Sequence, residues 1–320
     1  DIIGNIQADI SGIEHSADYG TEHITTGIDM SLETIQAIIN GDIWKYKTEL
    51  GMSTIDSAFG GFNNTDFIVV GGRPGMGKTM FSTTVTETVG LKNKKPVLFF
   101  SLEMPVEQIS ERVAFHRARV SKEDLLSKQS GVMDGAWGKV GHCMKDFIEA
   151  PIYINDKPSL SVHQVRAEAR RMSKKLGGLG VVIVDYLQKM RMSDPENMNR
   201  SVGEIATGLK NLAKELRCPV IALAQLNRKV EERANKRPVA ADLRESGVIE
   251  QEADVIFMIY RDEKYNPNTE LKGITEIICV KSRHAPGAEK TYHFSSRYSG
   301  LDPVAFHHSE QQEIDHDYEC

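Results

Sequence analysis

Short apolar runs alternate with amphipathic stretches from Asp66 onward. The runs are continuous and rich in Val, Ile and Phe, a pattern typical of strands that are buried on both faces of a parallel sheet. Stretches with helical periodicity separate them, as in residues 106–119 and 161–176. The pattern therefore predicts a doubly wound α/β fold, with a mostly parallel twisted sheet flanked by helices. The predicted strands are residues 67–70, 97–100, 181–184, 220–224, 255–260 and 274–280.

Two further amphipathic segments precede the α/β region. Both place isoleucine or leucine at three- and four-residue steps, which predicts helices, and Gly41 closes the second. The polar stretch between them, residues 16–26, is typical of a flexible linker. We expect residues 1–50 to form a helical linker segment that packs either on its own domain or on a neighbouring subunit. The apolar positions are Ile3, Ile6, Ile10 and Ile13 in the first segment and Leu32, Ile35, Ile38 and Ile39 in the second.

Length and composition fit one large domain with appendages. The chain has 320 residues, of which 40% are hydrophobic, and single cores stop growing at roughly 250 to 300 residues. We place the α/β domain at residues 51–305. Residues 306–320 are acidic and nearly free of apolar side chains, so we expect a disordered tail. Because the chain begins with Asp1 rather than Met, we expect further residues to precede it in the full protein.

Charge and cysteine content exclude several classes of protein. The net charge of −6 does not fit a protein coated in basic surface, so any nucleic-acid contact must come from local clusters of Lys and Arg. The four cysteines lack C-x-x-C spacing and fit free thiols in a reducing cytosol. No apolar run approaches the roughly 18 residues that a membrane span requires. We therefore expect a cytoplasmic protein without disulfides, structural zinc or membrane segments.

A phosphate-binding loop follows the first predicted strand. It reads Gly72-Arg73-Pro74-Gly75-Met76-Gly77-Lys78-Thr79 and matches the pattern G-x-x-x-x-G-K-[ST] between a strand and an amphipathic helix. The glycines let the backbone amides curl around phosphate oxygens at a helix N-terminus. Lys78 is then expected to reach the β and γ phosphates of ATP, and the Thr79 hydroxyl to bind Mg²⁺.

Three polar residues follow the ends of other predicted strands, where ligands collect in open α/β sheets. Asp185 is a candidate Mg²⁺ ligand through the water shell, or an ordinary strand-end Asp that faces solvent. Glu103 is a candidate base that orients the attacking water, or a residue that complements the N-terminus of the helix opening at Pro105. Gln225 is a candidate sensor of the γ phosphate, or a hydrogen-bonded polar strand end.

Five motifs occur in the order found in one family. They are Gly-Arg-Pro-Gly-Met-Gly-Lys-Thr, Phe-Ser-Leu-Glu-Met-Pro, Val-Asp-Tyr-Leu-Gln, Ala-Gln-Leu-Asn-Arg and Asp-Leu-Arg-Glu-Ser-Gly-Val-Ile-Glu-Gln-Glu-Ala-Asp. From about residue 54 to about residue 294 the chain resembles the C-terminal motor of bacterial or bacteriophage DnaB-type replicative helicases, a RecA-like P-loop ATPase. The last motif is highly specific to that family. The resemblance implies an ATP-dependent enzyme that translocates on single-stranded DNA and unwinds duplex at the replication fork.

The resemblance also assigns roles to residues already singled out. Lys78 and Thr79 become ligands of phosphate and Mg²⁺, Glu103 the catalytic base, Asp185 the metal acid and Gln225 the sensor. The family places a Lys and an Arg two residues apart on a late strand, where they reach the neighbouring subunit's nucleotide. Lys281-Ser-Arg283 matches that spacing. The turn that follows departs from the family pattern, because His284-Ala-Pro-Gly replaces Asn-Gly-Pro, and its orientation stays open.

Two polar segments, residues 188–202 and 227–247, follow strand ends and are long enough to reach the axis of a ring. The second carries a local basic cluster, for which a solvated surface is the alternative. The resemblance assigns contacts with the backbone of single-stranded DNA to Arg244, Glu245 and Gly247. Apart from Tyr186 at the edge of the first segment neither holds an aromatic residue, so we expect phosphate tracking without base stacking. The cluster consists of Arg228, Lys229, Arg233, Lys236, Arg237 and Arg244.

Assembly and partners follow from the resemblance alone. It implies a homo-hexamer that moves 5′ to 3′ on single-stranded DNA, with a primase and a helicase loader as candidate partners. Within P-loop proteins, the alternative is a RecA-like recombinase or a clock-type ATPase. A different class is an ATP-gated assembly scaffold, in which nucleotide only controls docking. Unwinding of a forked duplex marks the helicase, strand exchange the recombinase, and an ATPase that ignores single-stranded DNA the scaffold.

Overall fold

The computed structural model describes residues 23–42, 46–194, 197–243 and 246–304. Four features of the sequence lie outside these residues: the isoleucine pattern of residues 1–15, the tail at 306–320, and the candidate DNA contacts Arg244 and Glu245. Within the described residues, no helix combines the length and the apolar character that crossing a bilayer requires.

The described strands form one nine-stranded sheet and a separate pair. The order in the large sheet is β11-β10-β9-β8-β3-β7-β6-β4-β5, and the six strands from β8 to β5 are parallel. The strands β9, β10 and β11 extend it in antiparallel fashion. Their bounds are β3 Phe67–Gly72, β4 Val97–Ser101, β5 Ile152–Asn155, β6 Val181–Asp185, β7 Val220–Gln225, β8 Val255–Tyr260, β9 Ile274–Ser282, β10 Thr291–Arg297 and β11 Gly300–Pro303; the pair is β1 Lys47–Thr48 with β2 Phe62–Asn63.

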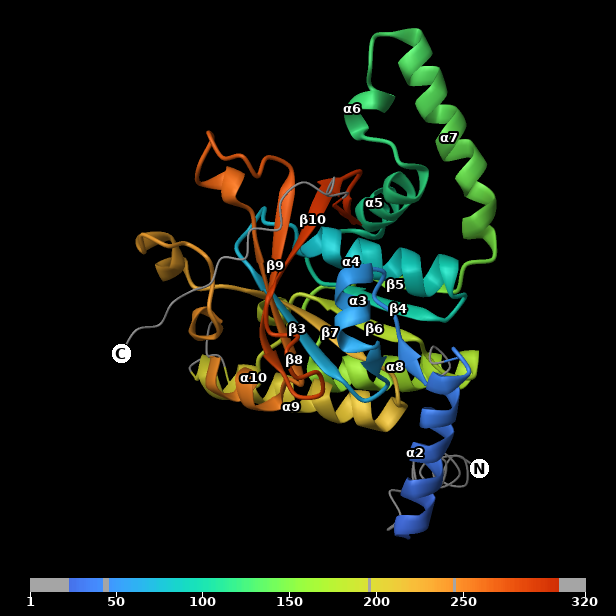
Figure 1. The fold of residues 1–320 in the computed structure, drawn as a ribbon, viewed down its shortest axis with the longest axis vertical. Coiled ribbons are helices and arrows are strands. Elements are labelled where there is room, and N and C mark those ends of the chain that lie inside the picture. The colour runs from blue at the N-terminus through green and yellow to red at the C-terminus, as the bar shows by residue number, and fades with distance from the viewer. Residues whose placement is uncertain (1–22, 43–45, 195–196, 244–245, 305–320) are drawn as a thin grey trace, which may run out of the picture.

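Helices cover both faces of the sheet (Figure 1). Along β3, Ile68 and Val70 face one layer while Phe67 and Val69 face the other, so two hydrophobic cores form. Because β3, β4, β6, β7 and β8 are buried almost throughout, their sequences are continuous apolar runs, whereas the edge strand β5 is only half-buried. One layer holds α3 (Ser53–Phe59), α4 (Lys78–Thr86), η2 (Glu87–Lys92) and α5 (Val106–Ala118); the other holds α8 (Val162–Leu176), α9 (Met198–Leu216) and α10 (Ser246–Glu252).

The predicted α/β class, the mostly parallel sheet and the six predicted strands are confirmed. Five of the six strands are parallel, and β9, which holds residues 274–280, pairs with β8 in antiparallel register. The connection from Tyr260 to Ile274 holds only the short 3-10 turn η6 (Asp262–Lys264). A parallel return needs a crossover of a dozen or more residues, usually a helix, which this connection does not supply.

The helix α2 (Ile24–Ile39) begins earlier than the sequence pattern predicts. Residues 24–26 belong to the helix rather than to a linker, because His23 caps its N-terminus and Ile24 and Ile28 continue the apolar stripe of Leu32 and Ile35. Of the whole helix only Ala37 is buried. Of the two alternatives for this segment, packing on its own domain is therefore wrong, and packing on a neighbouring subunit stays a prediction. Its exposed apolar side chains are Ile24, Ile28, Met30, Leu32, Ile35, Ile38 and Ile39.

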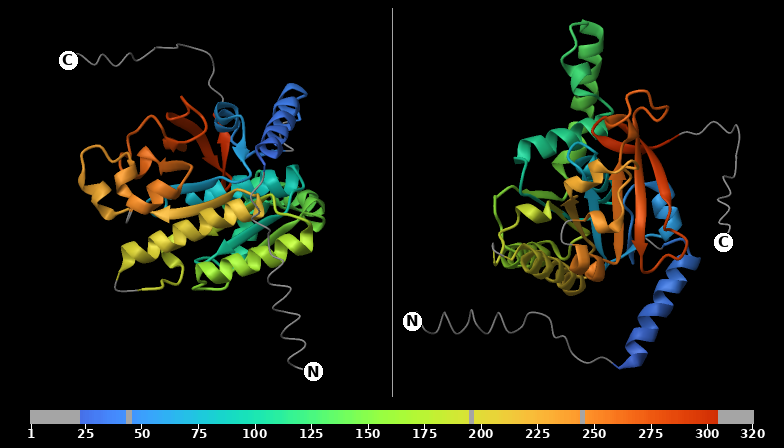
Figure 2. Two further views of the ribbon diagram at one scale, coloured as in Figure 1. Left: turned by 90° about the horizontal axis from the view of Figure 1, so that it is seen from below. Right: turned by 90° about the vertical axis from the view of Figure 1, so that its left-hand side faces the viewer.

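A helical hairpin projects from the other end of the molecule. It consists of α6 (Lys122–Leu125) and α7 (Ser130–Ile148), which pack on each other and on α5 through a small apolar cluster. Figures 1 and 2 show α7 and α2 projecting from opposite ends of the molecule. An apolar groove of about 390 Å³ lies between α5, α7 and β5, and Val113, Met144 and Phe147 contribute to its walls.

Candidate active site

An open cleft of about 360 Å³ lies where the parallel strands end. Five strands contribute to it: β3 through the phosphate loop, and β4, β6, β7 and β8 through a residue at or just after the strand end. Because parallel strands share one carboxyl edge, residues that are far apart in sequence meet here. The cleft is lined by Pro74, Gly75, Gly77, Lys78, Thr79, Met80, Glu103, Met104, Arg112, Asp185, Tyr186, Gln225 and Arg261.

The phosphate loop has the backbone that its glycines predict. Gly77 has a φ of 112°, a conformation that L side chains rarely adopt, and α4 begins directly after it at Lys78. Lys78 Nζ donates to the carbonyls of Gly72 and Arg73 at 2.7 and 3.3 Å. Two predicted loop residues have side chains elsewhere: Met76 packs in the core, and Arg73 donates to Glu231.

Burial shifts the pKa values of Lys78 and Asp185, the two central charged groups of the cleft. It lowers the pKa of Lys78 to about 8, although Asp185 and Glu103 oppose this shift. It raises the pKa of Asp185 to about 6, although Lys78 opposes that shift. Asp185 is 5% exposed, so it does not face solvent in the way of an ordinary strand-end Asp. Lys78 and Asp185 thus stabilise each other's charge in a place where water does so poorly.

Glu103 lines the cleft, and another residue caps the helix that follows it. The amide of Val106, at the start of α5, donates to Asp156 Oδ2 at 3.0 Å. Gln225 also lines the cleft. The backbone amide of Gln225 donates to Gln188 Oε1 at 3.0 Å. The positions of Glu103 and Gln225 therefore favour contact with a ligand over a purely structural role.

Sequence reasoning missed two arginines that line the cleft, Arg112 and Arg261. Arg261 directly follows β8, so the rule that pointed to Asp185 and Gln225 applies to it as well. Arg112 lies on α5, and its charge acts on Asp185. Only the way α5 packs above the sheet brings Arg112 there, and the sequence pattern does not contain that information.

Lys281 and Arg283 lie at the opposite edge of the sheet from the cleft. Because β9 is antiparallel to β8, Ser282 pairs with Val255 at the first residue of β8, whereas the cleft lies beyond its last residue. Five steps along a strand span roughly 17 Å, more than the length of an arginine side chain. Both cations bond to the C-terminal end of α10: Lys281 Nζ donates to the Ala253 carbonyl at 2.7 Å, and Arg283 Nη2 to the Gln251 carbonyl at 2.6 Å.

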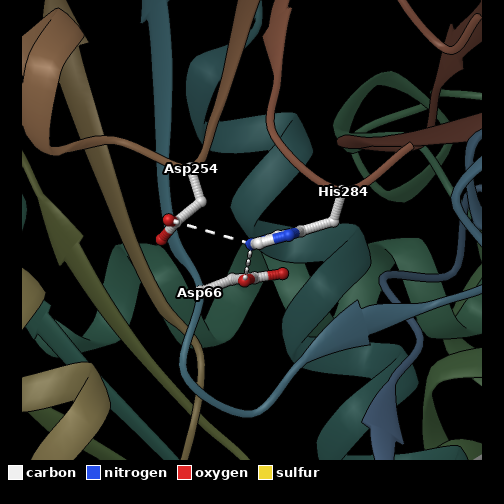
Figure 3. A group of neighbouring side chains, drawn as sticks. All are labelled: Asp66, Asp254 and His284. Atoms are coloured by element: carbon white, nitrogen blue, oxygen red, sulfur yellow. Dashed lines mark ion pairs between the residues drawn. The ribbon is translucent and has the colours of Figure 1, made fainter. Parts of the chain in front are cut away.

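The turn after Arg283 is oriented by a group of buried carboxylates (Figure 3). His284 Nε2 lies 3.5 Å from Asp66 Oδ1 and 4.0 Å from Asp254 Oδ1. Asp254 also accepts from Lys210 Nζ at 2.5 Å and from Arg283 Nη1 at 3.2 Å. Since Lys210 and Arg283 already neutralise Asp254, and Asp66 accepts from the Asn63 amide, the group fixes the turn and does not have the charge balance of a cation site.

The basic cluster of residues 227–247 is partly neutralised within the chain. Arg233 Nη2 pairs with Asp242 at 2.6 Å, and Arg237 binds Glu276 through two hydrogen bonds of 2.7 and 2.8 Å. Arg228 and Lys229 are exposed and form no ion pair with a described residue. Of the other candidate segment, residues 198–202 begin α9, and Val202 is buried in the core rather than free to reach DNA.

Comparison with known proteins decides the family. The model of the DnaB-like helicase C-terminal domain matches residues 48–302. The chain belongs to the DnaB-like helicase family. It is 45% identical to the replicative DNA helicase DnaB of Pasteurella multocida (strain Pm70) over 270 residues, which are 84% of this chain and 57% of that protein. It is 40% identical to that of Geobacillus stearothermophilus over 251 residues, 78% of this chain and 55% of the relative. The chain thus spans a little over half the length of these relatives.

Solved structures agree with this membership. One solved ATPase domain has a TM-score of 0.77 at 30% identity, and the match covers 87% of this chain and 98% of that domain. A DnaB-like replicative helicase, solved in a study of its interactions with primase, has a TM-score of 0.76 at 28% identity, covering 95% of this chain and 72% of its own. The RecA-like fold expected from the motifs is therefore confirmed, and family membership implies use of a nucleotide.

Proposed function

We propose that this chain is the ATP-driven motor of a replicative DNA helicase, which translocates on single-stranded DNA and unwinds duplex. The observation that carries the proposal is the meeting of Lys78, Thr79, Glu103, Asp185 and Gln225 in one cleft at the carboxyl edge of the sheet. They come from four different strand ends, and each matches a motif of the family. A chance glycine-rich turn would not bring the other three strand ends with it.

The donor set of the cleft fits ATP with Mg²⁺. The buried Asp185 carboxylate and the Thr79 hydroxyl offer the oxygen ligands that Mg²⁺ prefers, and the Lys78 ammonium suits phosphate oxygens. Mg²⁺ would supply neutralisation of charge on the β and γ phosphates. The loop from Gly72 to Gly77 would hold the phosphates at the N-terminus of α4 through its backbone amides, except at Pro74, which has no N–H and instead shapes the turn.

Hydrolysis needs a base near the terminal phosphate. Glu103 lines the same cleft as the phosphate loop, and Asp156 bonds to the first amide of the following helix, so Glu103 is available to accept a proton from water. Gln225 would contact the γ phosphate, and the segment that begins after it leads to the proposed DNA contacts Arg244, Glu245 and Gly247. These residues would track phosphates without reading sequence.

We further propose that Lys281 and Arg283 complete the cleft of a neighbouring subunit. The roughly 17 Å between them and their own cleft supports action in trans. The Lys281-Ser-Arg283 spacing also resembles the family's arginine finger, the Lys and Arg pair that reaches the neighbouring subunit's nucleotide, and this supports the same proposal. An isolated subunit would then hydrolyse ATP slowly, because an arginine finger contributes about 10³ to 10⁵ in turnover.

Assembly into a homo-hexamer would also cover the apolar stripe of α2. Seven exposed apolar side chains on one helix are costly to leave in water, and isolated helices of this length are marginal. The apolar groove lies beside the sheet, between α5, β5 and the last turns of α7, whereas α2 projects away from the sheet, so the α2 of a second copy suits the groove better than the chain's own. A primase and a helicase loader are further proposed partners, in line with the primase interaction of the related DnaB-like structure.

The helicase proposal is tested with ATP hydrolysis and strand separation. The assembled chain should hydrolyse ATP faster when single-stranded oligonucleotide is added, and it should separate a forked duplex only in the presence of ATP. Lys78→Ala should abolish both activities without unfolding the chain, and Lys128→Ala, which removes an exposed lysine elsewhere, should preserve both.

The alternative functions predict other outcomes of the same assays. A recombinase would form filaments and exchange strands. A scaffold would hydrolyse ATP at a rate indifferent to single-stranded DNA. For the clock-type alternative, a KaiC-like protein from Pyrococcus horikoshii OT3 has a TM-score of 0.55 at 17% identity, which is a likeness of fold alone. Failure to unwind despite DNA-stimulated hydrolysis would contradict the helicase proposal.

A further inference from the structure

Arg73 belongs to the phosphate loop by sequence, but its side chain turns to a different partner. Its Nε donates to Glu231 Oε1 at 2.8 Å, and its Nη1 donates to the Leu226 carbonyl at 3.0 Å. Glu231 lies in the 3-10 turn η4 (Arg228–Glu232), and Leu226 directly follows Gln225. The phosphate loop therefore holds the segment that leads from the cleft toward the proposed DNA contacts.

The base of this segment packs tightly on the strand that carries the phosphate loop. Leu226 and Leu243 form an antiparallel bridge, and the Asn227 amide donates to the Asp242 carbonyl at 2.9 Å. A Cβ on Gly71 would lie 2.9 Å from Leu226 Cδ2 and 3.2 Å from Leu243 Cδ2, so both leucines touch the end of β3. We call residues 227–242, which include η4 and η5 (Ala240–Asp242), the η4–η5 loop. Both of its ends rest on the phosphate-loop strand.

Arg73 also contacts the lysine that would bind phosphate. Lys78 Nζ donates to the Arg73 carbonyl at 3.3 Å. In the proposed function the same ammonium binds phosphate oxygens, so phosphate binding competes with this hydrogen bond. Arg73 thus joins the phosphate-binding lysine, through its carbonyl, to the η4–η5 loop, through its guanidinium.

The ion pair itself contributes little to the stability of the fold. The Glu231 side chain is 41% exposed, and ion pairs with an exposed partner are weak. The hydrogen bond from Arg73 is the main cause that holds the pKa of Glu231 below its usual value, so the carboxylate is charged at neutral pH. Removing that charge should leave the fold intact and release η4 from the phosphate loop.

We propose that Glu231 is a positioning residue that, through Arg73, couples phosphate binding in the cleft to the affinity of the chain for single-stranded DNA. This rests on the proposed function. The coupling is reciprocal, because a change in DNA affinity caused by nucleotide requires an equal change in nucleotide affinity caused by DNA. In the sequence, Arg244 and Gly247 follow Leu243 by one and four residues, so few residues separate them from the bridge that anchors the η4–η5 loop.

The test compares Glu231→Gln with Glu232→Gln in the assembled chain. Both variants remove one exposed carboxylate from the same turn, but Glu232 forms no ion pair with a described residue. The dissociation constant of a fluorescent oligothymidylate is measured by anisotropy with and without a non-hydrolysable ATP analogue. The ratio of the two constants reports coupling, and effects common to both states cancel in it.

We expect wild type and Glu232→Gln to share a ratio of about 5-fold or more, the lower end for coupled sites, and Glu231→Gln to have a ratio near 1. Glu231→Asp, which keeps the charge, should recover part of the ratio. A wild-type ratio in Glu231→Gln, or the same loss in Glu232→Gln, would overturn the inference. Failure of the proposed function differs from failure of this inference, because wild type would then bind no single-stranded DNA either with or without the ATP analogue.

Discussion

Substitutions of single cleft residues can separate nucleotide binding from ATP hydrolysis. Lys78 and Asp185 stabilise each other's charge in a buried place, so in the proposed mechanism a change in either should alter nucleotide binding as well as hydrolysis. Glu103 lines the same cleft but bears on the water rather than on the phosphates in the proposed mechanism. A variant of Glu103 therefore separates the two steps.

Glu103→Gln should bind ATP as wild type does and hydrolyse it about 10² to 10⁴ times more slowly, because the amide keeps the shape but does not accept a proton. Nucleotide affinity and single-turnover hydrolysis measure the two effects. Glu107→Gln, which removes an exposed carboxylate from the first turn of α5, is the matched control and should behave as wild type. Loss of ATP binding in Glu103→Gln would indicate a structural role.

Arg244 is expected to bind a phosphate of single-stranded DNA on the strength of its motif. Arg244→Ala should weaken binding equally for all sequences and reduce the slope of log affinity against log salt by roughly 0.7 for one lost contact. Lys214→Ala, which removes one exposed positive charge at the end of α9, is the control for net charge. If the slope is unchanged in Arg244→Ala, Arg244 contacts no phosphate and is an ordinary solvated charge.

At the scale of elements, a buried histidine joins three of them. His116 on α5 forms ion pairs with Glu87 at the start of η2 and with Asp302 on β11. Burial alone would lower the pKa of His116, but Asp302 and Glu87 raise it above its usual value of 6.5. Burial opposes the charge on Glu87 too, but His116 holds its pKa below the usual 4.5. Each partner thus keeps the other charged.

The free energy of unfolding should therefore depend on pH through His116. The raised pKa means that its contribution is full below about pH 6.5 and is lost as pH rises through the folded pKa; the contribution of Glu87 is full above about pH 4.5. His116→Gln should cost about 3 to 5 kcal/mol at pH 5.5 and less at pH 8.5.

Urea denaturation at both values of pH measures this difference, with His163→Gln on the exposed face of α8 as the control. If His116→Gln costs the same at pH 5.5 and 8.5, the histidine is not charged in the folded state, contrary to the ion-pair account.

The central strands and helices could be predicted because their burial imposes a recognisable pattern of apolar residues on the sequence. A parallel strand buried on both faces is a continuous apolar run, and a polar residue directly after it, such as Asp185, lies at the carboxyl edge. The strands β10 and β11 escaped prediction because their burial is mixed, as in Tyr292 beside exposed Thr291. Neither Arg112 nor the Arg73–Glu231 pair could be predicted from the sequence, because helix packing and loop conformation bring these residues into place and leave no local pattern.

At the scale of the whole molecule, the two halves of the proposed catalytic machinery lie at opposite edges of one sheet. Lys78 is at the carboxyl edge of β3, and Arg283 follows β9 at the other edge. One copy alone does not bring the halves together, so the proposed site needs a second copy that supplies Lys281 and Arg283. This geometry favours a ring or filament of identical subunits, with hydrolysis confined to the assembled state.

Complementation between two inactive chains tests this shared site most directly. Arg283→Ala retains an intact phosphate loop, and Lys78→Ala retains an intact finger. Each should form inactive assemblies by itself. When the two are mixed and shown to co-assemble, some interfaces join an intact loop to an intact finger, so ATP hydrolysis should return in part. Normal hydrolysis by assembled Arg283→Ala alone, or no recovery in co-assembled mixtures at any ratio, would contradict a site completed in trans.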